Sequence, residues 1–208
     1  MARADLSQKW MAIAKNGLPH SEMFFKSAKR ICKRMPWGTV EEMARELAAL
    51  RHNEGRLFVL GVGGSAANAS HAVCDFRKLC QIEAYAPTDN IAELTARAND
   101  NGFRTIFLDW LVGSNFNSHD AILVLSVGGG TDHVSHNLVH AINYAKSQQA
   151  RVFGIVGLGG HTAKVGDVVI VVPEMKPEWV TPLSESFQSL ILHCLVSHPS
   201  LQKGKTKW

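Results

Sequence analysis

The segment from Gly61 to His71 carries the residues best suited to chemistry in this sequence. It reads G-V-G-G-S-A-A-N-A-S-H and directly follows the apolar run Leu57–Leu60. Glycines permit positive φ and close approach of a ligand to the backbone, and the start of a following helix attracts anions through free N–H groups and its dipole. We therefore expect a phosphate or phosphosugar here, with the imidazole of His71 extending toward a reacting carbon. The binding residues predicted in this segment are Gly63, Gly64, Ser65 and Asn68.

Two pairs of side chains at opposite ends of the chain have spacings that allow joint action. His71 and Asp75 are four residues apart, which places them on one face of a helix as metal ligands or as a base and its orienting partner. Glu185 and His193 are about two turns apart on one side of a later helix, with Gln188 between them. If the two helices meet, the set suits proton transfer or a divalent metal such as zinc.

A second glycine turn, Leu125–Thr131, follows another apolar run. Its backbone N–H groups are predicted to hold a phosphate, with Ser126 and Thr131 adding hydroxyl hydrogen bonds. The alternative is a plain turn in which Thr131 or Asp132 caps the next helix. Two glycine turns at the carboxyl ends of parallel strands favour the ligand site, because ligands of open α/β sheets bind there.

Other patterns admit different interpretations. Gly61, Gly63 and Ala66 fit a dinucleotide fingerprint with Glu83 as the ribose acid, but that reading leaves His71 without a task. A tight turn without any ligand is also open. His133, His136 and His140 share one helix, where a solvated face is the favoured interpretation, and the segment 157–161 is predicted to be a loop bordering the pocket.

Five continuous apolar runs alternate with helix-length segments. Continuous hydrophobicity indicates strands covered on both faces, so the pattern predicts an α/β fold, a three-layer αβα sandwich around a five-stranded parallel sheet. The expected strands are 57–60, 82–85, 121–125, 152–156 and 168–172, and the expected helices are 65–74, 93–99, 131–147 and 182–197.

Residues 1–54 are predicted to form an N-terminal helical hairpin. Its two helices are expected at 21–34 and 39–52, broken by Pro36-Trp37-Gly38. A hairpin that joins neither sheet edge often packs on another subunit, so we expect a homo-oligomer, a dimer or tetramer. The rest of this single domain, 1–208, would be an α/β core at 55–198 and a basic tail at 199–208.

Bulk composition excludes several classes of protein. The net charge is +4 over 208 residues, with no basic face interleaved with aromatics, which argues against nucleic acid. No apolar stretch approaches the ~18 residues of a membrane span. Four cysteines without CxxC spacing, and no secretory signal, predict a cytoplasmic location.

Three blocks of the sequence resemble the SIS (sugar isomerase) family, and within it the phosphoheptose isomerases. The family's first glycine turn, G-N-G-G-S-x-x-D-A-x-H followed four residues later by Glu, is similar to 61–75. Its T-T-D and G-N-D-x-G-F segments are similar to 87–89 and 98–103. The resemblance covers about residues 20 to 197.

The family's C-terminal helix carries Q-E-x-H and a histidine five residues beyond. A gapless fit places Glu185 on the glutamine and Gln188 and His193 on the histidines. The resemblance implies that a zinc ion is held by His71, Asp75, Glu185 and His193. It implies Asp75, or Glu185, and His193 as the catalytic acid/base groups. The implied substrate-binding residues are Gly63, Gly64, Ser65, Asn68, Thr88, Asp89, Asn99, Asp100, Ser126, Gly128, Gly129, Thr131 and Gln188.

The sequence departs from the family at several of these positions. The phosphate loop S-T-S-G-N-S has become Ser126–Thr131, S-V-G-G-G-T, which loses two hydroxyls and an amide. Val62 replaces an asparagine expected to touch the sugar, Asp75 is one methylene shorter than glutamate, and Glu185 is charged where the family has an amide.

The resemblance implies an aldose–ketose isomerase acting on a phosphorylated sugar. The substrate would be sedoheptulose 7-phosphate, converted through an enediol to D-glycero-D-manno-heptose 7-phosphate, or a close analogue, for lipopolysaccharide or capsule. The alternative is a phosphosugar-binding, assembly or regulatory protein of the family without turnover. The altered phosphate loop favours the alternative, and the retained histidines and carboxylates favour the enzyme.

Overall fold

The computed structural model describes residues 17–131, 133–173 and 176–206, and within them a five-stranded sheet forms the centre. All four strand pairings are parallel, and the strand order is β2-β1-β3-β4-β5. In this order the chain leaves β1 toward one edge and returns to β3 on its other side, which makes the β1/β3 boundary the topological switch point. The strands are β1 (Leu57–Leu60), β2 (Ala84–Tyr85), β3 (Ala121–Ser126), β4 (Arg151–Val156) and β5 (Val168–Val171).

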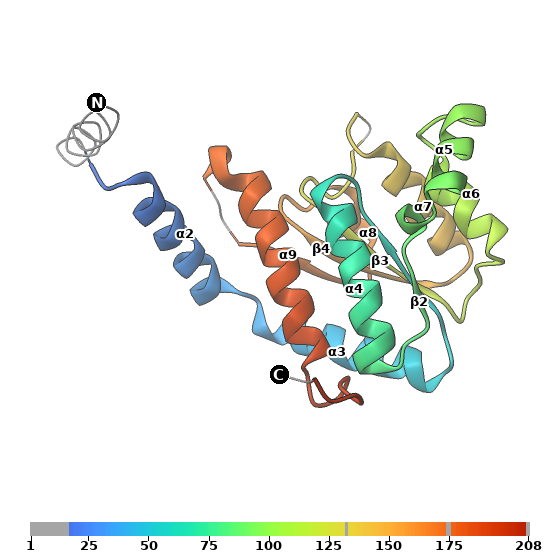
Figure 1. The fold of residues 1–208 in the computed structure, drawn as a ribbon, viewed down its shortest axis with the longest axis horizontal. Coiled ribbons are helices and arrows are strands. Elements are labelled where there is room, and N and C mark those ends of the chain that lie inside the picture. The colour runs from blue at the N-terminus through green and yellow to red at the C-terminus, as the bar shows by residue number, and fades with distance from the viewer. Residues whose placement is uncertain (1–16, 132, 174–175, 207–208) are drawn as a thin grey trace, which may run out of the picture.

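Helices cover both faces of the sheet, as the three-layer prediction requires (Figure 1). One face packs against α3, α4 and α9, and the other against α6 and α7. Neighbouring residues of β1 divide between these layers, with Leu57 and Val59 in the first and Phe58 and Leu60 in the second. The helices that follow the sheet's first strand are α4 (Gly64–Cys80), α5 (Ile91–Asp100), α6 (Ile106–Gly113), α7 (His136–Ser147), α8 (Gly160–Val165) and α9 (Val180–Val196).

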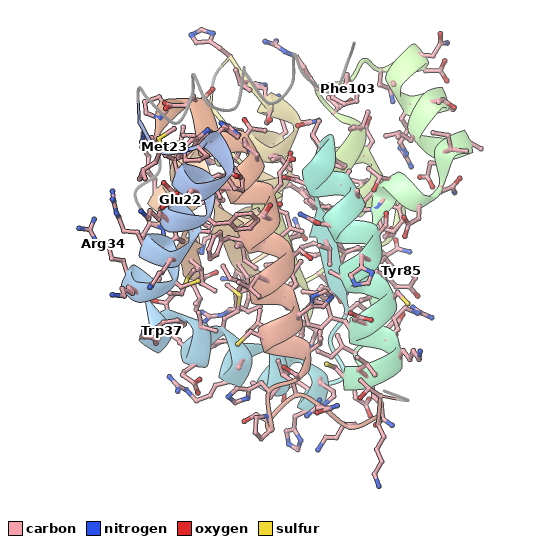
Figure 2. All side chains as sticks on the ribbon, turned by 60° about the vertical axis from the view of Figure 1, so that its left-hand side comes forward. Glu22, Met23, Arg34, Trp37, Tyr85 and Phe103 are labelled. Carbon is pink, nitrogen blue, oxygen red and sulfur yellow. The ribbon has the colours of Figure 1, made fainter. Side chains whose placement is uncertain are left out.

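Two helices precede the sheet, as expected: α2 (His20–Arg34) and α3 (Trp37–His52). Met43 and Leu47 of α3 are fully buried and belong to the core under the sheet. Helix α2 extends at the edge of the molecule beyond α9 (Figure 1), and exposed Trp37 lies at its junction with α3 (Figure 2). A role of these helices in assembly remains a prediction.

Several element boundaries differ from those predicted. Helix α7 begins at His136 instead of residue 131, because the Thr131 hydroxyl accepts hydrogen bonds from the N–H groups of His133 and Val134 and holds a separate turn. The segment 157–161 was predicted to be a loop, but its last two residues begin helix α8. Helix α6 was not predicted, because its residues are apolar on nearly every side and show no amphipathic helical spacing. None of the described helices is long and apolar enough to cross a membrane.

Candidate active site

Helices α4 and α9 lie side by side on one face of the sheet and carry most of the predicted chemical groups (Figure 1). Helix α4 starts directly after Gly63, whose φ of 63° is costly for residues with a β-carbon. It ends before Gln81, which adopts the left-handed conformation typical of a helix end. The pair therefore brings residues 64–80 alongside residues 180–196, as the two spacing patterns require.

His71, Asp75 and His193 converge from the two helices. The Nε2 atoms of the two histidines are 2.9 Å apart. An oxygen of Asp75 lies 3.3 Å from Nε2 of His71 and 3.8 Å from Nε2 of His193. About half of each imidazole is exposed, whereas the Asp75 side chain is 17% exposed. The three groups are thus held close together, with the carboxylate behind two accessible rings.

This donor set fits zinc. Two imidazole nitrogens and one carboxylate oxygen are ligands that catalytic zinc uses, with one position left for water or substrate. Ligand atoms around tetrahedral zinc are separated by roughly 3.3 Å, given metal–nitrogen bonds of about 2.0 Å. The observed separations of 2.9, 3.3 and 3.8 Å bracket that value. Among the described residues, these three are the set of histidine, cysteine and carboxylate side chains whose possible metal-ligand atoms all lie within 4.8 Å of one another.

A cavity of about 610 Å³ opens beside the three groups. Its walls include Lys78 on α4 and, from the C-terminal tail, Gln202 and Thr206. The tail is fixed there because the N–H groups of Lys203 and Gly204 donate to the carbonyl of Leu79, at 2.7 and 2.8 Å. Apart from His71, Asp75 and His193, no residue of this wall was predicted from the sequence. The composition of the C-terminal tail does not indicate where the tail packs on the rest of the chain.

Glu185 does not join this group. A β-carbon added to Gly64 would overlap both carboxylate oxygens of Glu185, so the carboxylate lies against the first residue of α4. A negative charge is stabilised at that end of a helix by the N–H groups and the dipole. The first glycine turn was predicted to attract an anion, and in this structure the anion beside it is the protein's own carboxylate.

Asn68 and Gln188 connect the two helices. The Asn68 amide donates to the carbonyl of Glu185 at 2.9 Å and to Oε1 of Gln188 at 3.1 Å. Gln188 is fully buried, and its Nε2 has no hydrogen-bond partner among the described residues. Ser65, predicted to bind the substrate, is 2% exposed in the first turn of α4. The substrate contacts of these residues remain predictions.

The second glycine turn is closed by contacts within the protein. Ser126 accepts a hydrogen bond from the N–H of Gly129 at 3.0 Å. Gly129 has a φ of 71° and packs so closely on Gly159 that a β-carbon at Gly129 would overlap the carbonyl oxygen of Gly159. The carbonyl oxygen of Gly129 accepts a hydrogen bond from the hydroxyl of Thr162 on α8. Because Thr131 holds its own turn and Ser135 is the N-cap of α7, the alternative in which Thr131 caps the next helix is wrong, and Asp132, the other candidate cap, lies outside the described residues. The described residues give no contact that assigns Gly128 a role.

Four further residues predicted to bind the substrate are not members of the histidine group. Asp89 accepts a hydrogen bond from Ser70, and the Thr88 hydroxyl is buried without a partner among the described residues. Asn99 and Asp100 are exposed at the end of α5 and bond to each other at 2.8 Å. The structure does not bring these last two residues to His71 and His193, and their roles stay predictions.

Comparison with known proteins finds one matching family model and several similar sequences and solved structures. The SIS domain family model matches residues 23–157. A phosphoheptose isomerase of Chlorobium phaeobacteroides is 33% identical over 142 residues, covering 64% of this chain and 61% of that relative. A phosphoheptose isomerase of Syntrophotalea carbinolica is 28% identical over 181 residues, covering 83% and 88%. The solved phosphoheptose isomerase of Neisseria gonorrhoeae has the same fold, with a TM-score of 0.73 at 22% identity over 92% of this chain and 97% of that one.

Proposed function

Because the chain belongs to the SIS domain family, we propose that it is a phosphosugar isomerase that interconverts an aldose and a ketose phosphate. The observation that carries the proposal is the convergence of His71, Asp75 and His193 from two helices. Relatives named phosphoheptose isomerase support sedoheptulose 7-phosphate, or a close analogue, as the substrate. A homo-oligomer acting in the cytoplasm in lipopolysaccharide or capsule synthesis is the matching cellular role.

The proposed chemistry moves one proton between neighbouring carbons. A base removes the proton from the carbon next to the carbonyl while an acid protonates the carbonyl oxygen, which gives the enediol. The base then returns its proton to the former carbonyl carbon while the other group takes the proton of the neighbouring hydroxyl, which becomes the new carbonyl. We assign Asp75 as the base, because its carboxylate oxygen lies 3.3 and 3.8 Å from the two imidazole Nε2 atoms, and His193 as the acid that protonates the carbonyl oxygen. His71 orients the carbonyl from the same side, 2.9 Å from His193.

The same three side chains would hold a zinc ion, and because a nitrogen bound to zinc carries no proton, the acid/base assignment above applies to the site without metal. A bound zinc supplies Lewis-acid polarisation of a carbonyl oxygen. Glu185 is a fourth ligand in this proposal only if its carboxylate leaves the start of α4, where it lies against Gly64.

A second function is favoured by one observation. The hydroxyls of Ser126 and Thr131 were predicted to bind the phosphate. In the structure they accept hydrogen bonds from backbone N–H groups of their own turns. A phosphosugar-binding protein without turnover would tolerate this arrangement more readily than an enzyme would.

Turnover with and without zinc separates the two functions. Sedoheptulose 7-phosphate is incubated with metal-free and zinc-loaded protein, and exchange at the first two carbons is followed by NMR in D₂O. The isomerase incorporates deuterium, and His193→Ala lowers the rate at least 100-fold. No exchange in either form, together with saturable binding of the sugar phosphate, would establish the binding protein instead.

A further inference from the structure

The C-terminal tail lines the cavity of about 610 Å³ beside the histidine group. This cavity follows α4 as far as Leu79 and α9 as far as Ser197, and Gln202 and Thr206 of the tail form part of its wall. Figure 1 shows the tail, in dark red, turning beneath the ends of α4 and α9. The volume is within the range of small-molecule sites. The space open to a ligand therefore extends from the histidines to a segment beyond the last helix.

Backbone hydrogen bonds fix the tail at the end of α4. The last carbonyl groups of a helix have no partner within that helix. The carbonyl oxygen of Leu79 accepts hydrogen bonds from the N–H groups of Lys203 and Gly204, at 2.7 and 2.8 Å. A β-carbon added to Gly204 would lie 2.8 Å from the carbonyl oxygen of Lys78, so the tail packs on the helix without room for a side chain. The tail thus supplies partners that α4 itself lacks.

Arg51 of α3 also holds this junction. Its Nη1 donates to the carbonyl oxygens of Cys80 at 2.9 Å and Leu201 at 2.6 Å, and its Nη2 donates to that of Ser200 at 2.9 Å. A positive charge near the end of a helix is also stabilised by the helix dipole. Leu201 is fully buried in the core. One side chain therefore connects α3, the end of α4 and the tail.

This anchoring leaves the polar side chains of the tail available. No hydrogen bond within the described part of the chain uses the amide of Gln202 or the hydroxyl of Thr206. Amides and hydroxyls each donate and accept hydrogen bonds, which matches the hydroxyl groups of a sugar. Lys78 adds an ammonium donor to the same wall. A polyhydroxylated ligand is the chemical class that these groups suit.

We propose that Gln202 and Thr206 bind the hydroxyl-bearing carbon chain of the sugar, and that Arg51 positions them. Toward the start of α4 the hydrogen bond between Asn68 and Gln188 joins the helices, so the chain of the sugar extends from the histidines toward the tail. The tail lies beyond residues 20–197, so the family resemblance assigns it no role. Assigning the contacts to a sugar phosphate rests on the proposed function, whereas binding of that ligand does not require turnover.

Calorimetric titration with sedoheptulose 7-phosphate tests the two side chains directly. Gln202→Ala and Thr206→Val should each raise the dissociation constant about two- to tenfold, the effect of losing one hydrogen bond between neutral groups. Ser200→Ala is the matched control, because it removes an exposed hydroxyl of the same tail that does not line the cavity. Zinc affinity should equal that of the wild type in all three variants, because none of these residues belongs to the histidine group. Circular dichroism checks that each variant is folded.

Arg51 is tested as a positioning residue by combining substitutions. Arg51→Gln should weaken binding of the same sugar phosphate as much as Gln202→Ala and Thr206→Val do together. Adding these two to Arg51→Gln should cause no further loss, because the side chains have already left the wall. Gly204→Ala should give the same result without a change at Arg51, since its β-carbon would displace the tail from Lys78. Losses that multiply would show that Arg51 does not act through the tail.

Binding and turnover together separate these contacts from the proposed function. A raised dissociation constant in both side-chain variants, with Ser200→Ala unchanged, supports the contacts even if NMR detects no exchange in D₂O. An unchanged dissociation constant in folded Gln202→Ala and Thr206→Val overturns them, even if the wild type is an active isomerase. Weaker binding accompanied by a loss of zinc affinity also overturns them, because the effect would then come from the histidine group.

Discussion

The two halves of the α4–α9 contact use polar residues in different ways. Near the start of α4, Asn68 bonds both Glu185 and Gln188, and Glu185 rests against Gly64, so most of these polar groups are satisfied by one another. Two turns further on, the rings of His71 and His193 are half exposed and crowded around one point beside a cavity. We call the first part, around Asn68, Glu185 and Gln188, the structural half, because its hydrogen bonds connect the two helices. We call the second part, around His71, Asp75 and His193, the reactive half, because its rings are accessible to a ligand.

The largest expected effect comes from the reactive half. Asp75→Ala removes both the proposed base and one of three metal ligands, so turnover of the sugar phosphate should fall at least 100-fold. Zinc affinity, measured by competition with a chromogenic chelator, should fall as well. Cys74→Ala is the control, because it changes the neighbouring exposed residue on the same helix. Full activity in Asp75→Ala would remove this half from the mechanism.

The structural half should instead affect stability. Asn68→Ala and Asn68→Asp both remove the amide donor that bonds α9, so each should lower the free energy of unfolding by about 1–3 kcal/mol. Urea denaturation measures the loss. Wild-type stability in Asn68→Asp would show that the bridge between the helices does not depend on donation from Nδ2.

A smaller effect is expected at Glu185, where the comparison can be sharpened. Glu185→Gln keeps the shape but removes the charge at the start of α4, which should cost about 0.3–1 kcal/mol at low salt and less at high salt. Melting temperatures at the two salt concentrations measure this. If zinc affinity changes while the salt-dependent stability does not, Glu185 belongs to the reactive half.

The smallest effect concerns the far end of the helix pair. Burial raises the pKa of the Cys80 thiol to about 11, and its Sγ lies 3.7 Å from the carbonyl of Val196 on α9. At pH 8 Cys80 should react with a thiol reagent much more slowly than exposed Cys74, because the thiolate is the nucleophile. Mass spectrometry of labelled peptides measures both rates. Equal rates would mean that α4 and α9 separate readily at this end.

Much of the fold could be predicted from the sequence. Continuous apolar runs such as Leu57–Leu60 indicated buried parallel strands, and four of the five strands were placed to within one residue at each end. The start of α7 could not be predicted, because glycines followed by Thr131 are equally compatible with a helix that begins at residue 131 and with a turn that precedes a later helix start. Only the hydrogen bonds to Thr131 from His133 and Val134 show that the chain makes a turn first. His133, His136 and His140 were predicted to share a solvated helix face, because no carboxylate or cysteine is close to them in sequence. His133 instead precedes α7, and it lines a cavity together with His136.

The sequence by itself determined that His71 and Asp75 share a helix face and that Glu185 and His193 share another, since helical spacing is a local property. Tertiary structure decided which of these groups meet. Parallel packing of α4 on α9 sets His193 opposite His71 and sets Glu185 opposite Gly64, two turns earlier. The helix start there attracts the carboxylate by its dipole. That pairing depends on the distance between residues far apart in the chain, which no local pattern encodes.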